Sequence, residues 1–117
     1  MYRSLIVARI RPGTEPAVAR IFAASDSTDL PRTVGVLGRE LYSLGDCYVH
    51  LLDTERPTAE ALDAARADAG FAQVSDELRS YISPYLPTWR GPNDAVAPCF
   101  YRWRPGSGHP PRTAMPA

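Results

Sequence analysis

Two strand-like segments meet at Gly45-Asp46, and this junction constrains the fold more than any other feature of the chain. The stretch TVGVLGRELYSLGDCYVHLLDT, residues 33–54, predicts a hairpin with a two-residue turn. Glycine supplies the positive φ that such a turn needs. Counting outward from the turn places Arg39 opposite Leu52, two residues beyond His50. Arg39 and His50 are then diagonal neighbours on one sheet face, about 7–8 Å apart at Cα, so both can contact one small molecule.

An arginine and a histidine side by side on an apolar sheet face have two interpretations. A fixed cation beside a titratable imidazole suits a site for acid–base chemistry. Alternatively, arginine buries its stem and keeps its charged end in water, and a single histidine in a strand serves packing. A slip of the register by one residue would also move the two side chains to opposite faces. The spacing alone leaves these interpretations open.

The other segments alternate between strand-like and helix-like patterns. A first strand is rich in Leu, Ile and Val, and Thr14 suits the N-cap of the helix that follows it. Gly70 interrupts a second helical region, which ends before Pro84. The expected order is strand 2–10, helix 14–25, polar loop 26–31, strands 33–44 and 47–54, helix 57–66, helix 71–82 and strand 99–104.

This β-α-β-β-α-β order predicts an α+β, ferredoxin-like fold, in which a four-stranded antiparallel sheet carries its helices on one face. The other face would be bare but apolar. The side chains expected on it include Val34, Val36, Tyr42, Val49 and Leu51. A bare apolar face predicts an interface, and the simplest partner is a second copy packed face to face in a homodimer.

Length and composition limit the functional classes. The chain of 117 residues predicts one domain at 1–104 and a disordered Pro/Gly-rich tail at 105–117. Thirteen basic and thirteen acidic residues cancel, and no basic run with interleaved aromatics suggests nucleic-acid binding. No apolar stretch is long enough to cross a bilayer and no signal peptide is visible, so we expect a cytoplasmic protein without a membrane partner. Cys47 and Cys99 lack the short spacing of zinc ligands, so we expect reduced thiols and no metal.

The motifs of the common cofactor-dependent and hydrolytic enzymes are absent from the sequence. It contains no phosphate-binding glycine loop, dinucleotide fingerprint, G-x-S-x-G elbow or His-Glu zinc motif. A nucleophile with a paired base is not evident either. Chemistry at Arg39 and His50 would therefore be acid–base chemistry in an apolar cavity, without a cofactor.

Several segments together resemble the tetracenomycin-type aromatic polyketide cyclases of type II polyketide synthesis. They span the chain in the family's order up to about Arg104. The matching segments are SDSTDLP at 25–31, Gly35-Val36 with Arg39, DCYVHL at 46–51, Ala65-Arg66 with Phe71, SPY at 83–85 with Trp89, and FYRW at 100–103. One departure precedes Phe71, where relatives often carry His-Pro and this chain has Asp68 and Ala69. We do not expect a substrate contact of the family at that point to carry over unchanged.

The resemblance implies a fold and an activity. The fold is a dimeric ferredoxin-like α/β barrel with a pocket between sheet and helices in each subunit. The activity is aldol-type ring closure with dehydration and aromatisation of an aromatic polyketide intermediate, without a cofactor, in antibiotic or pigment biosynthesis. Other components of the type II synthase are expected partners besides the second subunit.

The resemblance also assigns roles to residues. The family's proton-transfer and polarising residues match Asp26, Arg39 and His50. A permanent cation suits a developing enolate, and an imidazole exchanges protons near neutral pH. Asp26 would orient the imidazole or deliver a proton during dehydration, if its loop folds over the pocket mouth. The expected substrate-binding residues are Tyr48, Asp29, Arg66, Trp89, Tyr101 and Trp103, whose aromatic members are either flat walls for a polyaromatic ligand or ordinary core.

Two other functions stay open at this point. The first is a cofactor-free monooxygenase on the same dimeric fold, in which a bound phenolate reacts with O₂ directly. The second is a non-catalytic binding module that shields reactive polyketides within a synthase complex. Oxygen consumption identifies the first, and binding of an aromatic product without rate enhancement identifies the second.

Overall fold

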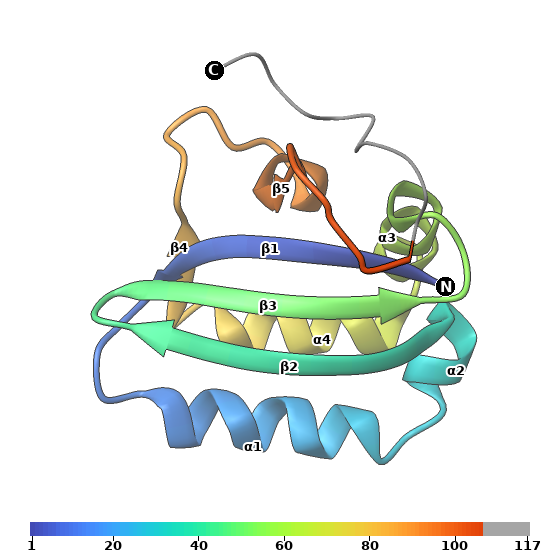
Figure 1. Ribbon diagram of the computed structural model, residues 1–117. Helices are drawn as coiled ribbons and strands as arrows, with labels where there is room; N and C mark the ends of the chain where they lie inside the picture. The colour runs from blue at the N-terminus through green and yellow to red at the C-terminus, as the bar shows by residue number, and fades with distance from the viewer. Residues whose placement is uncertain (107–117) are drawn as a thin grey trace.

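An antiparallel sheet with helices packed on one face forms the core of the computed structural model, which describes residues 1–106 (Figure 1). Figure 1 looks onto the sheet from its open side, with α4 passing behind β2 and β3. The elements are β1 (Tyr2–Ile10), α1 (Glu15–Asp26), α2 (Leu30–Val34), β2 (Val36–Leu44), β3 (Cys47–Thr54), α3 (Thr58–Arg66), α4 (Ala69–Leu78), β4 (Ile82–Pro84), the 3₁₀ helix η1 (Pro92–Ala95) and β5 (Val96–Ala97). The predicted α+β class with an antiparallel sheet is confirmed. The predicted tail at 105–117 lies almost entirely outside the described residues.

The central hairpin has the predicted register. β2 and β3 join at Gly45, whose φ of 60° is the positive value expected for the turn. Leu41 lies opposite His50 and Arg39 lies opposite Leu52. Arg39 and His50 therefore share the sheet face that the helices cover, as the turn predicts.

The edge of the sheet beside β1 differs from the prediction. The sheet order is β2-β3-β1-β4, and β5 also pairs with β1, so the sheet of the described residues has five strands where we expected four. β4 pairs with Ala8–Ile10, and β5 pairs with Leu5 and Ile6. The fourth strand position is thus one interrupted strand, from which the segment 85–95 departs. Proline has no N–H to donate to a ladder, and Pro84 stands where the pairing stops.

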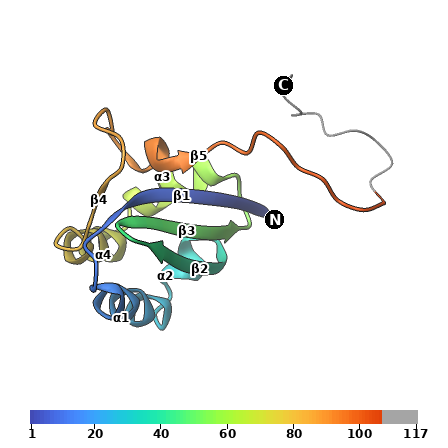
Figure 2. The same ribbon diagram turned by 60° about the vertical axis from the view of Figure 1, so that its left-hand side comes forward.

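The predicted last strand at 99–104 is wrong. Its residues form no regular structure, and the chain there extends away from the sheet (Figure 2). Phe100, Tyr101 and Trp103 are exposed on this segment. Their composition is typical of a strand, but the place beside β1 is already occupied by β4 and β5.

The start of β2 also needs correction. The sequence predicts a strand from residue 33, but Leu30–Val34 is the short helix α2, and Gly35 ends it with a φ of 88°. Val34 is consequently buried in the core. A bulge between Val36 and Gly38 shifts the strand parity and turns Val36 toward the helices. Neither valine lies on the bare sheet face where we expected it.

The two later helices are divided at Asp68 instead of Gly70. Asp68 caps α4, because its side chain accepts hydrogen bonds from the N–H groups of Gly70 and Phe71 at 2.7 and 3.3 Å. α4 then ends at Leu78, four residues earlier than predicted, and Ile82 belongs to β4.

The apolar core is split into two clusters. One gathers Ala8, Ile10, Val18 and Tyr48 beneath α1 and α4. The other gathers Val34, Ala61 and Ala65 between α2 and α3. Within residues 1–106, no helix is long and apolar enough to cross a membrane.

Candidate active site

A cavity of about 510 Å³ lies between the sheet and the helices, where the two core clusters face each other. Its walls are mostly apolar and come from both clusters. Phe22 of α1 and Phe71 of α4 are large aromatic members of this lining. A cavity of this size suits a small, largely apolar ligand.

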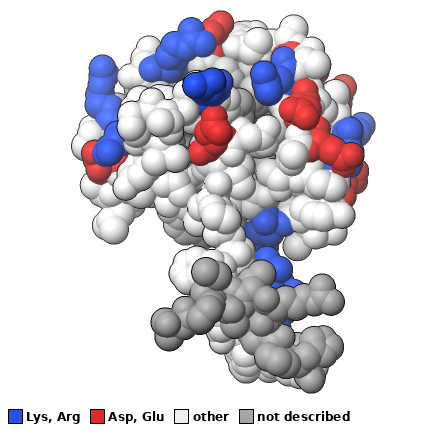
Figure 3. All heavy atoms as spheres, turned by 90° about the horizontal axis from the view of Figure 1, so that it is seen from above, with Lys and Arg blue, Asp and Glu red and all other residues white. Residues whose placement is uncertain are grey.

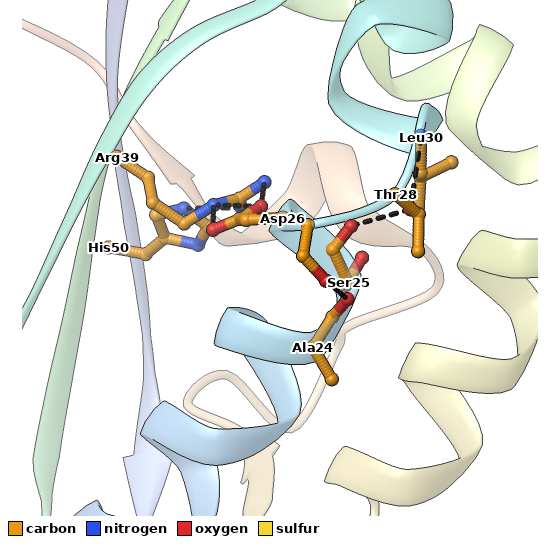
Figure 4. A network of polar contacts seen from close by, with 8 residues as sticks. Ala24, Ser25, Asp26, Thr28, Leu30, Arg39 and His50 are labelled. Atoms are coloured by element: carbon orange, nitrogen blue, oxygen red, sulfur yellow. Dashed lines mark hydrogen bonds and ion pairs between the residues drawn. The ribbon is translucent and has the colours of Figure 1, made fainter.

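Arg39, Asp26 and His50 form the polar network at this site (Figure 4). The Arg39 guanidinium donates from Nε to both oxygens of Asp26 at 3.0 and 3.1 Å, and its Nη2 lies 2.8 Å from Asp26 Oδ1. Its Nη1 lies 3.3 Å from His50 Nε2. The predicted triad is therefore brought together, with Arg39 between the other two. Arg39 and His50 line the cavity, whereas Asp26 holds Arg39 from outside it.

The turn after α1 positions Asp26. Ser27 Oγ donates to the carbonyl of Ala24 at 2.7 Å, and Thr28 Oγ1 donates to the carbonyl of Ser25 at 2.6 Å. These bonds satisfy carbonyl groups at the end of the helix. A carboxylate at a helix C-terminus is unfavourable by itself, and the ion pair with Arg39 offsets that cost.

His50 is held as a neutral imidazole. Its side chain is buried, with the residue only 7% exposed, and burial together with the Arg39 charge lowers its pKa to about 3. A guanidinium has no acceptor, so Nε2 of His50 accepts the hydrogen bond and the ring proton lies on Nδ1. The sequence led us to expect titration near neutral pH, whereas burial, together with the nearby Arg39 charge, lowers the pKa of the imidazole below that range.

Aromatic rings pack around the imidazole. The Phe22 ring meets His50 edge-on, with centroids 5.4 Å apart, and the Arg39 guanidinium lies 4.9 Å from the centre of the same Phe22 ring. The Tyr48 ring lies edge-on to His50 at 6.3 Å. These contacts fix the orientation of both polar groups.

Of the expected substrate-binding residues, the structure brings two to the cavity. Tyr48 lines it from β3, and Trp89 lines it from the segment between β4 and β5. Trp89 is 40% exposed, so it belongs to the rim of the cavity rather than to the core.

The other four expected residues lie elsewhere. Asp29 precedes α2, where its carbonyl accepts from Thr33, and Arg66 pairs with Asp63 on the surface of α3 at 3.8 Å. Tyr101 and Trp103 are exposed on the extended C-terminal segment. None of the four lines this cavity, and their substrate contacts remain predictions.

Several polar lining residues were missed by sequence reasoning. They are Ser25, Ser75, Arg79 and Ser83. Ser75 had a readable signal, because it lies four residues after Phe71 on the apolar stripe of α4, where a hydroxyl serves no packing purpose. No sequence pattern marked Ser83 and Arg79 as lining residues, because their positions depend on where α4 ends and the interrupted strand begins.

The charges of the molecule are mixed. Figure 3 shows acidic and basic side chains close together on the face that it presents. In the described part of the chain, no three His, Cys, Asp or Glu residues gather as metal ligands would.

Comparison with known proteins agrees with this architecture. The sequence profile of the family described as polyketide synthesis cyclase matches residues 2–104. The chain is 48% identical to an uncharacterized protein of Streptomyces coelicolor, over 88% of this chain and 95% of that protein. It is 39% identical to the polyketide synthase CurG of Streptomyces cyaneus, over 88% of this chain and 97% of that protein.

A third relative also has a solved structure. The tetracenomycin F2 cyclase of Streptomyces glaucescens is 36% identical over 87% of this chain and 94% of that protein. Its structure, described as that of a type-II polyketide cyclase, matches with a TM-score of 0.81, covering 89% of this chain and 98% of that chain.

Proposed function

Since the chain belongs to the polyketide synthesis cyclase family and is an enzyme, a polyketide cyclase, we propose that it closes a ring of an aromatic polyketide by an aldol reaction followed by dehydration, without a cofactor. One observation carries this proposal: a guanidinium and a neutral imidazole lie 3.3 Å apart on the wall of an apolar cavity. These are the two groups that an aldol cyclisation needs, a fixed positive charge for an oxyanion and a group that exchanges protons.

The proposed reaction begins with proton transfer. When substrate binds, the Arg39 Nη1–H turns from His50 Nε2 to a substrate oxygen, which frees the Nε2 lone pair. Nε2 of His50 then takes a proton from a carbon that lies between two carbonyl groups, and the electron pair moves onto that oxygen as an enolate. Arg39 donates hydrogen bonds to that oxygen. The guanidinium has a second N–H on each terminal nitrogen, beyond those bound to Asp26 and His50 in the described structure. The negative charge that develops on this oxygen during proton transfer favours the imidazolium, so it opposes the lowering of the His50 pKa by burial and by the Arg39 charge.

Ring closure and water loss complete the sequence. The enolate carbon attacks a ketone carbon of the same chain, a C–C bond forms, and the ketone oxygen takes the proton back from the imidazole. Loss of the resulting hydroxyl with a neighbouring C–H proton releases water and leaves a C=C bond in the ring. The step needs no oxidant. Asp26 contributes by holding Arg39 in place through its ion pair.

Two assemblies belong to the proposal. We propose that the enzyme works as a homodimer formed through the open sheet face, and that it meets its substrate beside other components of the synthase. The exposed apolar side chains on that face, Leu5 and Tyr42 among them, support the dimer.

The test is turnover of a partly cyclised aromatic polyketide, followed by product mass and oxygen uptake. We expect a product lighter by one water and no oxygen consumption. Uptake of O₂ with a product that has gained oxygen would favour the monooxygenase alternative. Binding of substrate with no acceleration over the uncatalysed reaction would refute the cyclase proposal.

A further inference from the structure

The hydroxyl of Tyr48 has no hydrogen-bond partner among the described residues, although the residue is only 4% exposed. In residues 1–106, no polar side-chain atom that is fully closed off from solvent lacks a partner. The Tyr48 hydroxyl therefore keeps some accessible surface, and Tyr48 is one of the residues that line the cavity. A hydroxyl that has no protein partner, on a residue that lines an apolar cavity, is free to donate a hydrogen bond to a ligand.

Tyr48 and Arg39 lie on opposite sides of His50. Along β3, Tyr48 is two residues before His50, and Leu52, the partner of Arg39, is two residues after it. All four side chains point to the face that the helices cover. The imidazole thus has one donor on each side, the guanidinium at 3.3 Å and the tyrosine, whose ring lies 6.3 Å from the imidazole.

The tyrosine stays protonated, and can therefore donate, over the whole physiological pH range. Burial raises its pKa well above the ordinary value, and the Arg39 charge opposes this shift only in part. Tyr48 thus differs from His50, which accepts a hydrogen bond from Arg39 through Nε2.

We propose that the Tyr48 hydroxyl donates a hydrogen bond to a second oxygen of the bound substrate, and that this contact determines which carbons are joined. This inference rests on the proposed cyclase function. A polyketide carries an oxygen on every second carbon, so one oxygen held at Arg39 would let the chain shift by one unit and close a different ring. A second donor on the far side of His50 fixes the register of the chain across the proton-transfer group.

Tyr48→Phe is the variant that tests the proposal, because it removes only the hydroxyl and leaves the packing of the ring. The matched control is Tyr2→Phe, which removes a hydroxyl from an exposed tyrosine at the start of β1 that does not line the cavity. Melting temperatures of wild type and both variants should agree closely. A large drop for Tyr48→Phe would show a packing role for the hydroxyl and would count against the proposal.

The first readout is binding, which does not depend on turnover. Anthrone has one carbonyl oxygen and anthraquinone has two on opposite sides of the ring system. Their affinities can be followed through quenching of tryptophan fluorescence, since Trp89 lines the cavity. Wild type and Tyr2→Phe should prefer anthraquinone by roughly two- to tenfold, the range that one net hydrogen bond provides. Tyr48→Phe should lose this preference. Equal discrimination by Tyr48→Phe and wild type would overturn the proposal.

The second readout is the product mixture from a polyketide substrate. Tyr48→Phe should keep turning over substrate but release a larger share of products with a different ring closed, whereas Tyr2→Phe should match wild type. An unchanged product ratio with an active wild-type enzyme would overturn the inference and leave the cyclase proposal intact. A wild type without turnover that still discriminates between the two probes through Tyr48 would refute the cyclase proposal and support the oxygen-binding role of Tyr48.

Discussion

Arg39 has the central position among the individual residues of the site, because its charge acts in two directions at once. Toward the surface it pairs with Asp26 at the end of α1, and toward the cavity it adds to the burial that lowers the pKa of His50. In the proposed reaction the enolate would form beside a guanidinium that its ion pair with Asp26 already holds in place. Preorganisation of this kind is the main source of electrostatic catalysis.

We predict that Arg39 and His50 act as one unit in turnover. Arg39→Ala should reduce turnover by about 10²–10³-fold, with only partial rescue by Lys, because a point charge does not reproduce the planar fork. His50→Ala should reduce it by about 10²–10⁴-fold, and His50→Gln should not restore it. The double variant should lose less than the product of both losses, since both groups act on one transition state. Turnover of an aromatic polyketide measures this. Near-wild-type rates in both alanine variants, or losses explained by melting curves alone, would make the pair structural.

The lowered pKa of His50 predicts how stability depends on pH. The imidazole has a pKa of about 3 in the folded protein and 6.5 as the ordinary value. Above pH 6.5 both states are neutral. As the pH falls below 6.5 the unfolded chain takes up a proton that the folded protein refuses, so the free energy of unfolding decreases by roughly 1 kcal/mol per pH unit. His50→Gln lacks this contribution.

Urea unfolding of wild type and His50→Gln between pH 7.5 and pH 4 checks this pH dependence. The stability difference between the two proteins should change steadily in favour of the variant as the pH falls. Carboxylates such as Asp53 are common to both proteins and cancel in the difference. A constant difference over this range would contradict a buried neutral imidazole.

At the scale of elements, the sequence predicts the strand register that the turn at Gly45 sets. It misses the short elements α2, β4 and β5. Gly45 sets the parity of two long strands, so the face shared by Arg39 and His50 follows from counting. α2 has five residues and contains Thr33 and Val34, which favour strands. Its signals were nevertheless present, with Pro31 in the first turn and Gly35 after the last residue. β4 and β5 have three and two residues, which is too short for any alternation to show.

The departure at Asp68 has an explanation at the element scale. In this chain Asp68 is the N-cap of α4, and the helix it caps carries Phe71, Val74 and Ser75 into the cavity lining. Asp68 itself does not line the cavity.

Asp68→Ala should destabilise the protein by about 1 kcal/mol, because two N–H groups at the start of α4 lose their acceptor. The melting temperature should fall by roughly 4 °C, and Asn should restore most of the loss. Glu77→Ala, an exposed change on the same helix, serves as the control and should shift the melting temperature much less. Thermal unfolding followed by circular dichroism measures both. Equal effects of the two changes would contradict the capping role.

At the scale of the whole molecule, the two faces of the sheet have different purposes. One face is covered by helices and holds the cavity, and the other carries apolar side chains that no element within residues 1–106 covers. The open face follows from the alternation along β1, β2 and β3, except at Val36, where the bulge reverses it.

The homodimer prediction concerns this open face. Val49→Asp places a charge on it next to Val7, and burying that charge against a second copy should cost several kcal/mol per interface. Light scattering at micromolar concentration should show a dimer for wild type and a monomer for Val49→Asp. Ala19→Asp, on the exposed side of α1, should remain dimeric. A monomeric wild type would refute the prediction.

Because the fourth strand is interrupted, the segment 85–95 at the rim of the cavity can be exchanged for another sequence. β4 and β5 anchor the segment 85–95 to β1 at both ends, so its length can change without altering the register of the sheet. The loop-closure cost of a few added residues is small. Trp89 on this segment contacts the cavity from a position that the core does not constrain. A protein engineer could therefore graft other sequences between the two anchors to reshape the entrance while Arg39 and His50 stay in place, and natural diversification of such an enzyme has the same route available.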